Sequence, residues 1–304
     1  MFTLRSVILA AAAAILVGLS AESARAGYDL GLAANYGVLA NPGTHNFQLS
    51  SDDHITGNIG VLSSDMTSTG TNNNIKFANA TVTGRLDLQG TNTNGIGGTA
   101  TGGVFTGVSD VLTAYNTLTA LASTEAGKAG TTIVYSGTGG TTIAATNGTP
   151  DGNGNNVFTT TAAALSGSLN GTLTVSGTAS QYVVINITGT NQNFQFTQGI
   201  ALSGGITDDH VLLNFTGTGS IQVGGSGHGA TLHGDILAFG YTFNMDNVTV
   251  DGRVFGGDGS KDFQIVSGFN LNQPVNVPEP SSLALVALGG GACLAIRRRR
   301  ARRR

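Results

Sequence analysis

The sequence has little charge, no tryptophan and a single cysteine. Charged residues make up 10% of the 304 residues, and the one cysteine, Cys293, lies in an apolar run near the C-terminus. The chain before that run therefore forms no disulfide bond, and its stability must come from backbone hydrogen bonds and packing. A lone cysteine inside an apolar run also excludes thiol catalysis.

Basic residues are scarce in the long middle of the chain. Residues 27–280 contain five Lys and Arg against sixteen Asp and Glu, a net charge of −11. Nucleic-acid binding depends on the neutralisation of phosphates by Lys and Arg, so this composition excludes nucleic acid as a partner.

Glycine and small polar residues are abundant instead. The chain has 47 glycines, and 40% of its residues are hydrophobic. A disordered chain would be poorer in apolar residues and richer in charge. Glycine and threonine suit short strands and tight turns better than helices. We therefore expect a mainly β, extracellular protein.

The first 26 residues have the three parts of a secretory signal peptide. Arg5 provides the positive start, and residues 7–19 form a short apolar stretch. A small-x-small cleavage site follows, formed by Ala24, Ala26 and Gly27. The alternative is an uncleaved membrane anchor, but the apolar stretch is short for a spanning helix. The sequence thus predicts export and a signal helix at the N-terminus.

The C-terminus reads as a short membrane anchor. The segment Val277, Pro278, Glu279, Pro280 interrupts regular structure, and residues 281–296 are uncharged and largely apolar. Sixteen helical residues rise about 24 Å, less than the ~30 Å hydrocarbon core. A cytoplasmic tail follows, made of Arg297, Arg298, Arg299, Arg300, Arg302, Arg303 and Arg304. The positive-inside tendency then leaves the body outside.

This three-part ending resembles the PEP-CTERM sorting signal of bacterial envelope proteins. The resemblance implies that residues 277–280 are a recognition motif for an exosortase-type transpeptidase, and that the secretion machinery and the membrane are further partners. It also implies a membrane-anchored precursor that later reaches the cell surface or the extracellular space. The alternative is an ordinary tail anchor with a coincidental proline pair.

A short pattern with glycine at its third position recurs along the body. Its apolar residues alternate, as in half-buried strands, and the glycine indicates a bend or a close backbone approach. The copies are residues 55–61, 82–88, 169–175, 232–237 and 250–255. Gly57 and Gly84 are 27 residues apart, and Gly234 and Gly252 are 18 apart. Spacings near 20 predict a β-solenoid over residues 27–276, with a β-sandwich as the alternative.

One segment has helical periodicity. After Ser109 and Asp110, a candidate N-cap, apolar residues form one stripe, and Gly127 is a natural stop. The stripe consists of Val111, Leu112, Tyr115, Leu118, Leu121 and Ala122. We expect a single α-helix that flanks the solenoid. Residues 136–156 are rich in Gly, Thr and Asn, which predicts loops and turns.

The body also resembles a family at the level of motifs. The segments that carry the likeness are residues 31–40, 114–116, 182–189 and 232–257. They are similar to the choice-of-anchor A domains that often carry PEP-CTERM tails and, more distantly, to ice-binding β-solenoids with a flanking helix. The likeness implies a surface or matrix protein, and it brings no catalytic residues.

Several aspartates are candidate metal ligands. Calcium is a hypothesis, because pairs of aspartates stand before predicted strands and in Gly-rich loops. The candidates are Asp52, Asp53, Asp208, Asp209, Asp258 and Asp262. The Gly-rich loops at residues 151–155 and 258–262 do not complete the ligand spacing of an EF-hand. Asp and Gly are also ordinary turn formers, so we expect that the protein has no cofactor.

The sequence predicts a non-enzymatic structural or adhesive protein of the cell envelope or extracellular matrix, with exopolysaccharide as a candidate partner. An alternative is an ice- or glycan-binding solenoid, since outward threonines such as Thr172, Thr174, Thr81 and Thr83 could form an array. A carbohydrate-active enzyme is the third hypothesis. The body's only glutamates are Glu125 and Glu279, so a two-carboxylate mechanism would have to use aspartates.

Overall fold

The described part of the chain forms one compact unit that ends at Pro274. The computed structural model describes residues 27–43, 45–50, 52–62, 75–77, 79–91, 93, 96–135, 140–167, 171–196, 198–224, 229–266 and 268–274. The predicted signal segment and the segment from residue 277 onward lie outside these ranges. Within them, no helix is both long enough and apolar enough to cross a membrane.

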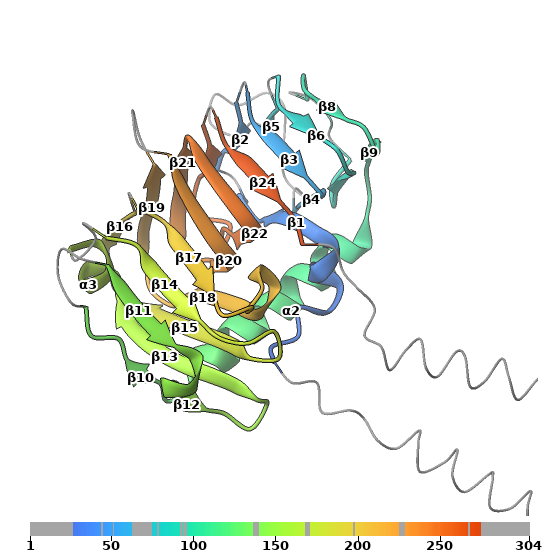
Figure 1. The fold of residues 1–304 in the computed structure, drawn as a ribbon. Helices are drawn as coiled ribbons and strands as arrows, with labels where there is room; N and C mark the ends of the chain where they lie inside the picture. The colour runs from blue at the N-terminus through green and yellow to red at the C-terminus, as the bar shows by residue number, and fades with distance from the viewer. Residues whose placement is uncertain are drawn as a thin grey trace, which may run out of the picture. The chain divides into compact units, whose positions relative to one another are not determined.

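Parallel strands stack into three faces around a common core (Figure 1). The helix face has the order β10 (Thr131–Thr132), β13 (Asn155–Thr161), β15 (Tyr182–Thr188), β18 (Val211–Phe215), β20 (Ala230–Ala238), β22 (Val248–Gly256), β1 (Tyr36–Ala40), β4 (Asn58–Val61), β7 (Leu86–Leu88) and β9 (Val104–Phe105). One short strand, β12 (Thr149–Pro150), pairs antiparallel with β13.

The second face, here called the threonine face, is the one toward the viewer in Figure 1. It consists of β11 (Thr141–Ala144), β14 (Leu173–Ser176), β17 (Ile200–Ser203), the first halves of β20 and β22, β24 (Asn270–Asn272), β3 (His54–Thr56), β6 (Thr81–Val82) and β8 (Thr99–Ala100). β17 contacts β20, so the face is continuous from β11 to β8.

The third face completes the coils. Its order is β16 (Gln192–Phe196), β19 (Gly219–Gly224), β21 (Tyr241–Asp246), β23 (Phe263–Ile265), β2 (Phe47–Leu49) and β5 (Ile75–Phe77). Alternate residues of all three faces point inward and form one buried apolar core, which includes Phe243, Val250 and Ile185. The parallel pairing fits the predicted solenoid. It contradicts the sandwich alternative, whose sheets are antiparallel.

The strands do not stack in chain order. β1 lies between β22 and β4, and β24 lies between β22 and β3. The N-terminal strands therefore extend the stack beyond the C-terminal ones, and the chain must return to the opposite end before β10. Helix α2 (Ser109–Ala126) makes this return along the helix face, over about 27 Å.

The helix predicted after Ser109 is confirmed as α2, with Gly127 as its C-cap. Val111, Ala114 and Leu118 are buried against the sheet. Two details were wrong. The N-cap is Val108, so Ser109 lies inside the first turn, and Leu112 is 40% exposed because it lies off the packed stripe.

The prediction of a single flanking helix was also incomplete. A second α-helix, α3 (Ala162–Gly167), follows β13, and three 3-10 turns occur at η1 (Gly31–Asn35), η2 (Ala145–Asn147) and η3 (Asp208–His210). The segment 136–156, predicted as loops and turns, contains β11, η2, β12 and the start of β13. β11 pairs with β14 of the next coil, and β12 pairs antiparallel with β13.

The recurrent glycines form a column at the corner between the threonine and helix faces. Gly234 and Gly252 are in register within β20 and β22, with φ of 123° and 151°. A Cβ at Gly252 would lie 2.0 Å from the carbonyl oxygen of Gly234, and one at Gly84 would lie 2.3 Å from that of Gly57. Glycine is required here because coils approach too closely for a side chain. The copy at residues 169–175 is an exception, since Gly171 precedes β14 and starts a threonine-face strand.

Candidate functional site

The threonine face presents two rows of outward polar side chains. The first row contains Thr231, Thr249, Asn270, His54, Thr81 and Thr99, paired strand to strand. The second row contains His233, Asp251, Asn272, Thr56, Thr83 and Thr101. The residues between the rows, such as Leu232 and Val250, are buried. Strand geometry sets a grid of about 4.8 Å across strands and about 6.7 Å along them.

Both threonine pairs singled out in the sequence lie on this face, on different strands. Thr81 and Thr83 belong to the end near β8. Thr174 lies on β14, in register with Thr142 and Ala201, and Thr172 directly precedes that strand. The backbone explains their orientation, since outward residues alternate with the buried Leu173 and Val82.

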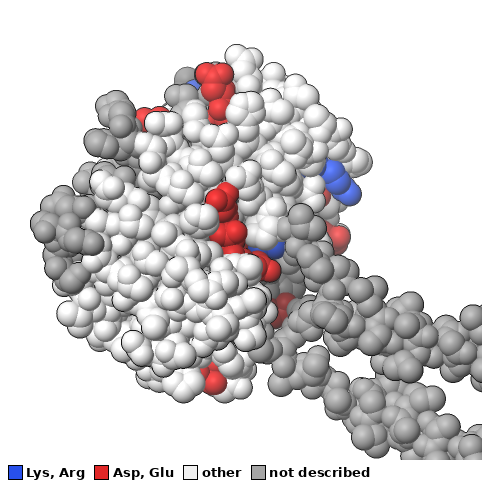
Figure 2. All heavy atoms as spheres, viewed as in Figure 1, with Lys and Arg blue, Asp and Glu red and all other residues white. Residues whose placement is uncertain are grey.

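Charged side chains interrupt the centre of the face. Figure 2 shows this side of the molecule as mostly uncharged, with acidic side chains gathered in a short strip across its middle. Nδ1 of His233 lies 2.7 Å from Oδ1 of Asp208 and 3.5 Å from Oδ2 of Asp251. Asn272 donates to Oδ1 of Asp251 at 2.7 Å.

The pKa of the central histidine is raised. The hydrogen bond with Asp208 raises the pKa of His233, burial opposes this, and the charges of Asp208 and Asp251 add to the increase. The centre of the face therefore holds an imidazole that is hydrogen-bonded to Asp208 and lies near the carboxylate of Asp251.

The aspartates proposed as calcium ligands do not converge. Asp53 is buried and accepts hydrogen bonds from the backbone N–H of Ser50 at 2.7 Å and of Phe269 at 3.1 Å. Asp262 accepts from the N–H of Asn46, and Asp258 accepts from Ser260 within its own turn. Asp52 has a φ of 67°, as in a turn.

Asp208 and Asp209 lie in η3, where Asp209 accepts a hydrogen bond from Thr207. Among the described residues, no group of three His, Cys, Asp or Glu could hold a metal ion. The described structure therefore places these aspartates in separate turns and loops, where most of them accept their own hydrogen bonds.

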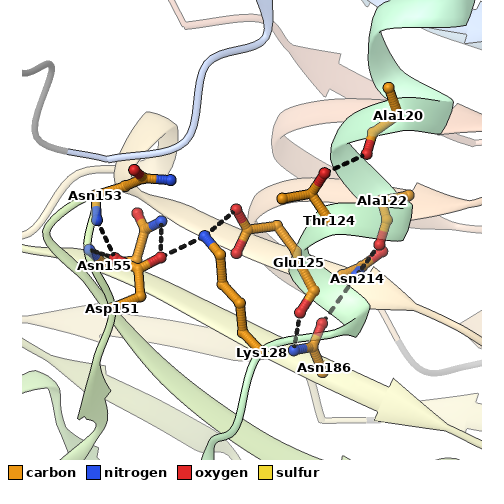
Figure 3. A network of polar contacts seen from close by, with 10 residues as sticks. All are labelled: Ala120, Ala122, Thr124, Glu125, Lys128, Asp151, Asn153, Asn155, Asn186 and Asn214. Atoms are coloured by element: carbon orange, nitrogen blue, oxygen red, sulfur yellow. Dashed lines mark hydrogen bonds and ion pairs between the residues drawn. The ribbon is translucent and has the colours of Figure 1, made fainter.

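A polar network between α2 and the sheet was missed by the sequence reasoning (Figure 3). Asn186 donates to the carbonyl of Glu125 at 2.7 Å, and Asn214 donates to that of Ala122 at 3.0 Å. These carbonyls belong to the last turn of the helix, and that of Glu125 also accepts a hydrogen bond from the backbone N–H of Lys128 at 3.1 Å. Asn186 and Asn214 therefore attach the end of α2 to β15 and β18.

The remaining predicted site residues can be placed only in part. Gly27, on the far side of the predicted cleavage site, is described and buried. Ala24 and Ala26, the motif at residues 277–280 and the arginine tail lie outside the described residues. Most face residues, including Thr231 and Thr249, gave no signal in the sequence because their alignment depends on pairing between coils.

Two family models match the chain. A model described as "Putative Ice-binding-like adhesive domain" matches residues 23–265. A model of the PEP-CTERM protein-sorting motif matches residues 276–300, which confirms the resemblance predicted for the C-terminus. A search of curated proteins gave no match.

A solved structure of an ice-binding protein has a similar fold. The crystal structure of an ice-binding protein from the Antarctic ascomycete Antarctomyces psychrotrophicus is 18% identical, with a TM-score of 0.51, over 82% of this chain and 100% of that one. A domain of a Shewanella frigidimarina ice-binding protein is 15% identical, with a TM-score of 0.49, over 82% and 98%. At 18% identity, the similarity to the Antarctomyces psychrotrophicus structure indicates a shared fold and nothing about function.

Proposed function

Because the chain belongs to the family of ice-binding-like adhesive domains and carries a PEP-CTERM sorting motif, we propose that it is a surface adhesin whose threonine face makes the contact. The sorting motif implies export toward the cell surface and processing by an exosortase at the membrane. The further steps, signal removal after Ala26 and recognition of Pro278, Glu279 and Pro280, belong to this proposal.

The observation that carries the proposal is the pair of in-register rows on the threonine face. A rigid, nearly regular grid of hydroxyl and amide groups matches a ligand that is itself repetitive and rich in hydrogen-bonding groups. Each single contact is weak, because it replaces a hydrogen bond to water. Many simultaneous contacts from a rigid face sum to useful adhesion without a deep pocket, because little ordering entropy is lost.

The ligand class that fits best is a hydrated polysaccharide. The centre of the face carries His233, Asp208 and Asp251, and charged groups form the stronger hydrogen bonds to hydroxyls. Sugar hydroxyls both donate and accept, so they can satisfy the carboxylates, the amides of Asn270 and Asn272 and the threonine hydroxyls together.

Ice is the second candidate, favoured by one observation. Toward β8 the two rows become purely threonine, with Thr81 beside Thr99 and Thr83 beside Thr101. A neutral hydroxyl array of this kind could order water, whereas the charged centre would interrupt it. Thermal hysteresis of the purified protein would support ice; ordinary crystal growth would support the polysaccharide.

The test compares substitutions on two faces. Thr56 and Thr231 are exposed, so Thr56→Tyr and Thr231→Tyr should leave the fold intact, since tyrosine is also a good strand residue. We expect the double variant to lose about tenfold or more in affinity for insoluble polysaccharide, which corresponds to about 1.4 kcal/mol. The matched control is Thr242→Tyr on β21 of the third face.

Equal losses in the control and the double variant would contradict the assignment of the face. Incubation with soluble polysaccharides should release no new reducing or unsaturated ends. Their appearance would favour the carbohydrate-active enzyme over the adhesin.

A further inference from the structure

The first described residue, Gly27, is held in a defined position. Its backbone N–H donates to the carbonyl of Asn153 at 2.8 Å. Its φ is 109°, and a Cβ would lie 2.4 Å from the ring of Tyr182. The next residue is anchored as well: the hydroxyl of Tyr28 donates to the carbonyl of Asp209 at 2.9 Å and lies 3.3 Å from Oδ2 of Asp235.

Gly27 lines a pocket at the end of helix α2. The pocket has a volume of about 360 Å³, and Asp29, Glu125 and Asn153 contribute to its wall. Gly27 is also the residue that the small-x-small pattern places directly after the signal cleavage site. The future N-terminus of the exported chain therefore lines the same pocket as two acidic residues, Asp29 and Glu125.

The charges at this pocket do not balance (Figure 3). Nζ of Lys128 lies 2.6 Å from Oε1 of Glu125 and also forms an ion pair with Asp151. The exposures of these two carboxylates are 1% and 8%. The ammonium of Lys128 thus forms ion pairs with two buried carboxylates, those of Glu125 and Asp151. Asp29 is a further acidic residue at the pocket. Within the described residues, Oε2 of Glu125 has no hydrogen-bond partner although it is buried.

An unpartnered buried carboxylate oxygen is energetically unfavourable. Burial raises the pKa of Glu125, and the hydrogen bond and charge of Lys128 offset this only in part. The site would accept a second cation with short, directed N–H donors.

We propose that the α-ammonium of Gly27, created by removal of the signal peptide, is this second cation, so that export maturation completes the fold. Hydrolysis of the Ala26–Gly27 peptide bond consumes one water, leaves the carboxylate on Ala26 and frees the amine of Gly27. With an ordinary pKa of about 7.7–8.0, this amine takes up a proton at neutral pH. It keeps one N–H on Asn153 and gains two donors and a positive charge facing the pocket. The proposal is independent of which ligand the threonine face binds.

The test uses the mature chain, residues 27–304, with its N-terminal amine either free or acetylated. Acetylation removes the charge and leaves one N–H, as in the precursor. We expect the free amine to give the higher melting temperature in wild type, and Glu125→Gln to reduce or abolish this difference. The double comparison is needed because Glu125→Gln alone disturbs the pair with Lys128.

A second readout is the pKa of the Gly27 amine. The acidic residues that line its pocket are Asp29 and Glu125. Lys128 and Asp151 are ion-paired next to Glu125, and Tyr28, Tyr182 and His210 form ring contacts near the N-terminal segment. With the acids in excess, the pKa should exceed its ordinary value by about one unit and return toward it in Glu125→Gln.

Three results would overturn the proposal: N-terminal sequencing that finds a mature end other than Gly27, equal melting temperatures for free and acetylated chains, or an amine pKa unaffected by Glu125→Gln. The first would refute the cleavage site, and the other two would refute the pairing. None of them bears on ligand binding by the threonine face.

Discussion

Arg253 and Asp235 form a buried ion pair across two neighbouring coils of the helix face. Nη1 of Arg253 donates to both carboxylate oxygens, at 3.1 and 3.2 Å, and the two side chains are 2% and 0% exposed. Each residue directly follows a corner glycine, and the two are in register. Tyr28 reaches the same carboxylate, so the pair also fixes the N-terminal segment.

Removing one partner of this pair should be strongly destabilising. Arg253→Met leaves Asp235 buried without its cation, which typically costs about 3–5 kcal/mol. Arg85 occupies the equivalent place after Gly84 and pairs with Asp87. The Asp87 side chain is 7% exposed, but that of Arg85 is 46% exposed, so water reaches the cation of this pair. Arg85→Met should therefore cost about 1 kcal/mol or less. Urea unfolding of both variants measures the difference, and equal losses would contradict it.

Asp53 should make stability depend on pH. Burial raises its pKa from 3.8 to about 7, against the lowering effect of the N–H groups of Phe269 and Ser50. The folded protein then binds a proton more tightly than the unfolded chain. The contribution of Asp53 to the free energy of unfolding is therefore largest below about pH 4 and is lost as pH rises through about 7.

The slope should approach about 1 kcal/mol per pH unit between these limits. Burial also raises the pKa of Asp235 to about 6, despite Arg253, and adds a loss of the same sign. Denaturation at several pH values should show a shallower decline in Asp53→Asn. Asp52→Asn, at an exposed turn position, is the control. An unchanged slope in Asp53→Asn would refute the assignment.

The glycine column should tolerate no side chain. Gly252→Ala would bring a Cβ against the carbonyl of Gly234 at a φ of 151°. We expect a loss of about 2 kcal/mol or more, because both coils must shift. Gly152→Ala is the matched control, since nothing lies within 4 Å of its added Cβ. Thermal unfolding compares the two, and a neutral Gly252→Ala would show that the coils can separate freely.

Asn186 should matter more than other strand asparagines. Asn186→Ala removes the donor to the carbonyl of Glu125 and the acceptor used by Asn214 at 2.8 Å. The carbonyl of Glu125 keeps the N–H of Lys128 and Asn214 keeps the carbonyl of Ala122, so each lost hydrogen bond should cost about 0.5–1.5 kcal/mol. Asn244→Ala, exposed on β21, should change stability by less than about 0.5 kcal/mol. Backbone amides at the end of α2 should also exchange their hydrogens faster in Asn186→Ala, and not in Asn244→Ala.

The C-terminal segment should decide where the protein is retained. Deletion of residues 277–304 removes the motif, the apolar segment and the arginine tail together. We expect the truncated protein to be released from the cells, whereas the intact chain is retained in the envelope fraction. Pro278→Ala with Pro280→Ala keeps the apolar segment and tests the motif alone. Retention that ignores the deletion would contradict the sorting prediction.

Features that depend on local sequence could be predicted. The apolar stripe from Val111 to Leu118 and the stop at Gly127 are local, and so is the helix they specify. The corner glycines at Gly57, Gly84, Gly234 and Gly252 were recognisable because each needs a backbone geometry that side chains disfavour. The sorting motif could be identified because a short linear segment carries it.

Other features arise only when distant segments meet. The amino-acid sequence by itself determined period-two strands, the helix and the glycine bends, since these reflect the conformational preferences of neighbouring residues. Only the tertiary structure decided that β1 inserts between β22 and β4, that Thr231 lines up through Asn270 with Thr81, and that Gly27 meets Asn153. The physical reason is register: coils with similar apolar patterns could stack in several orders, and burial summed over the whole stack selects one of them.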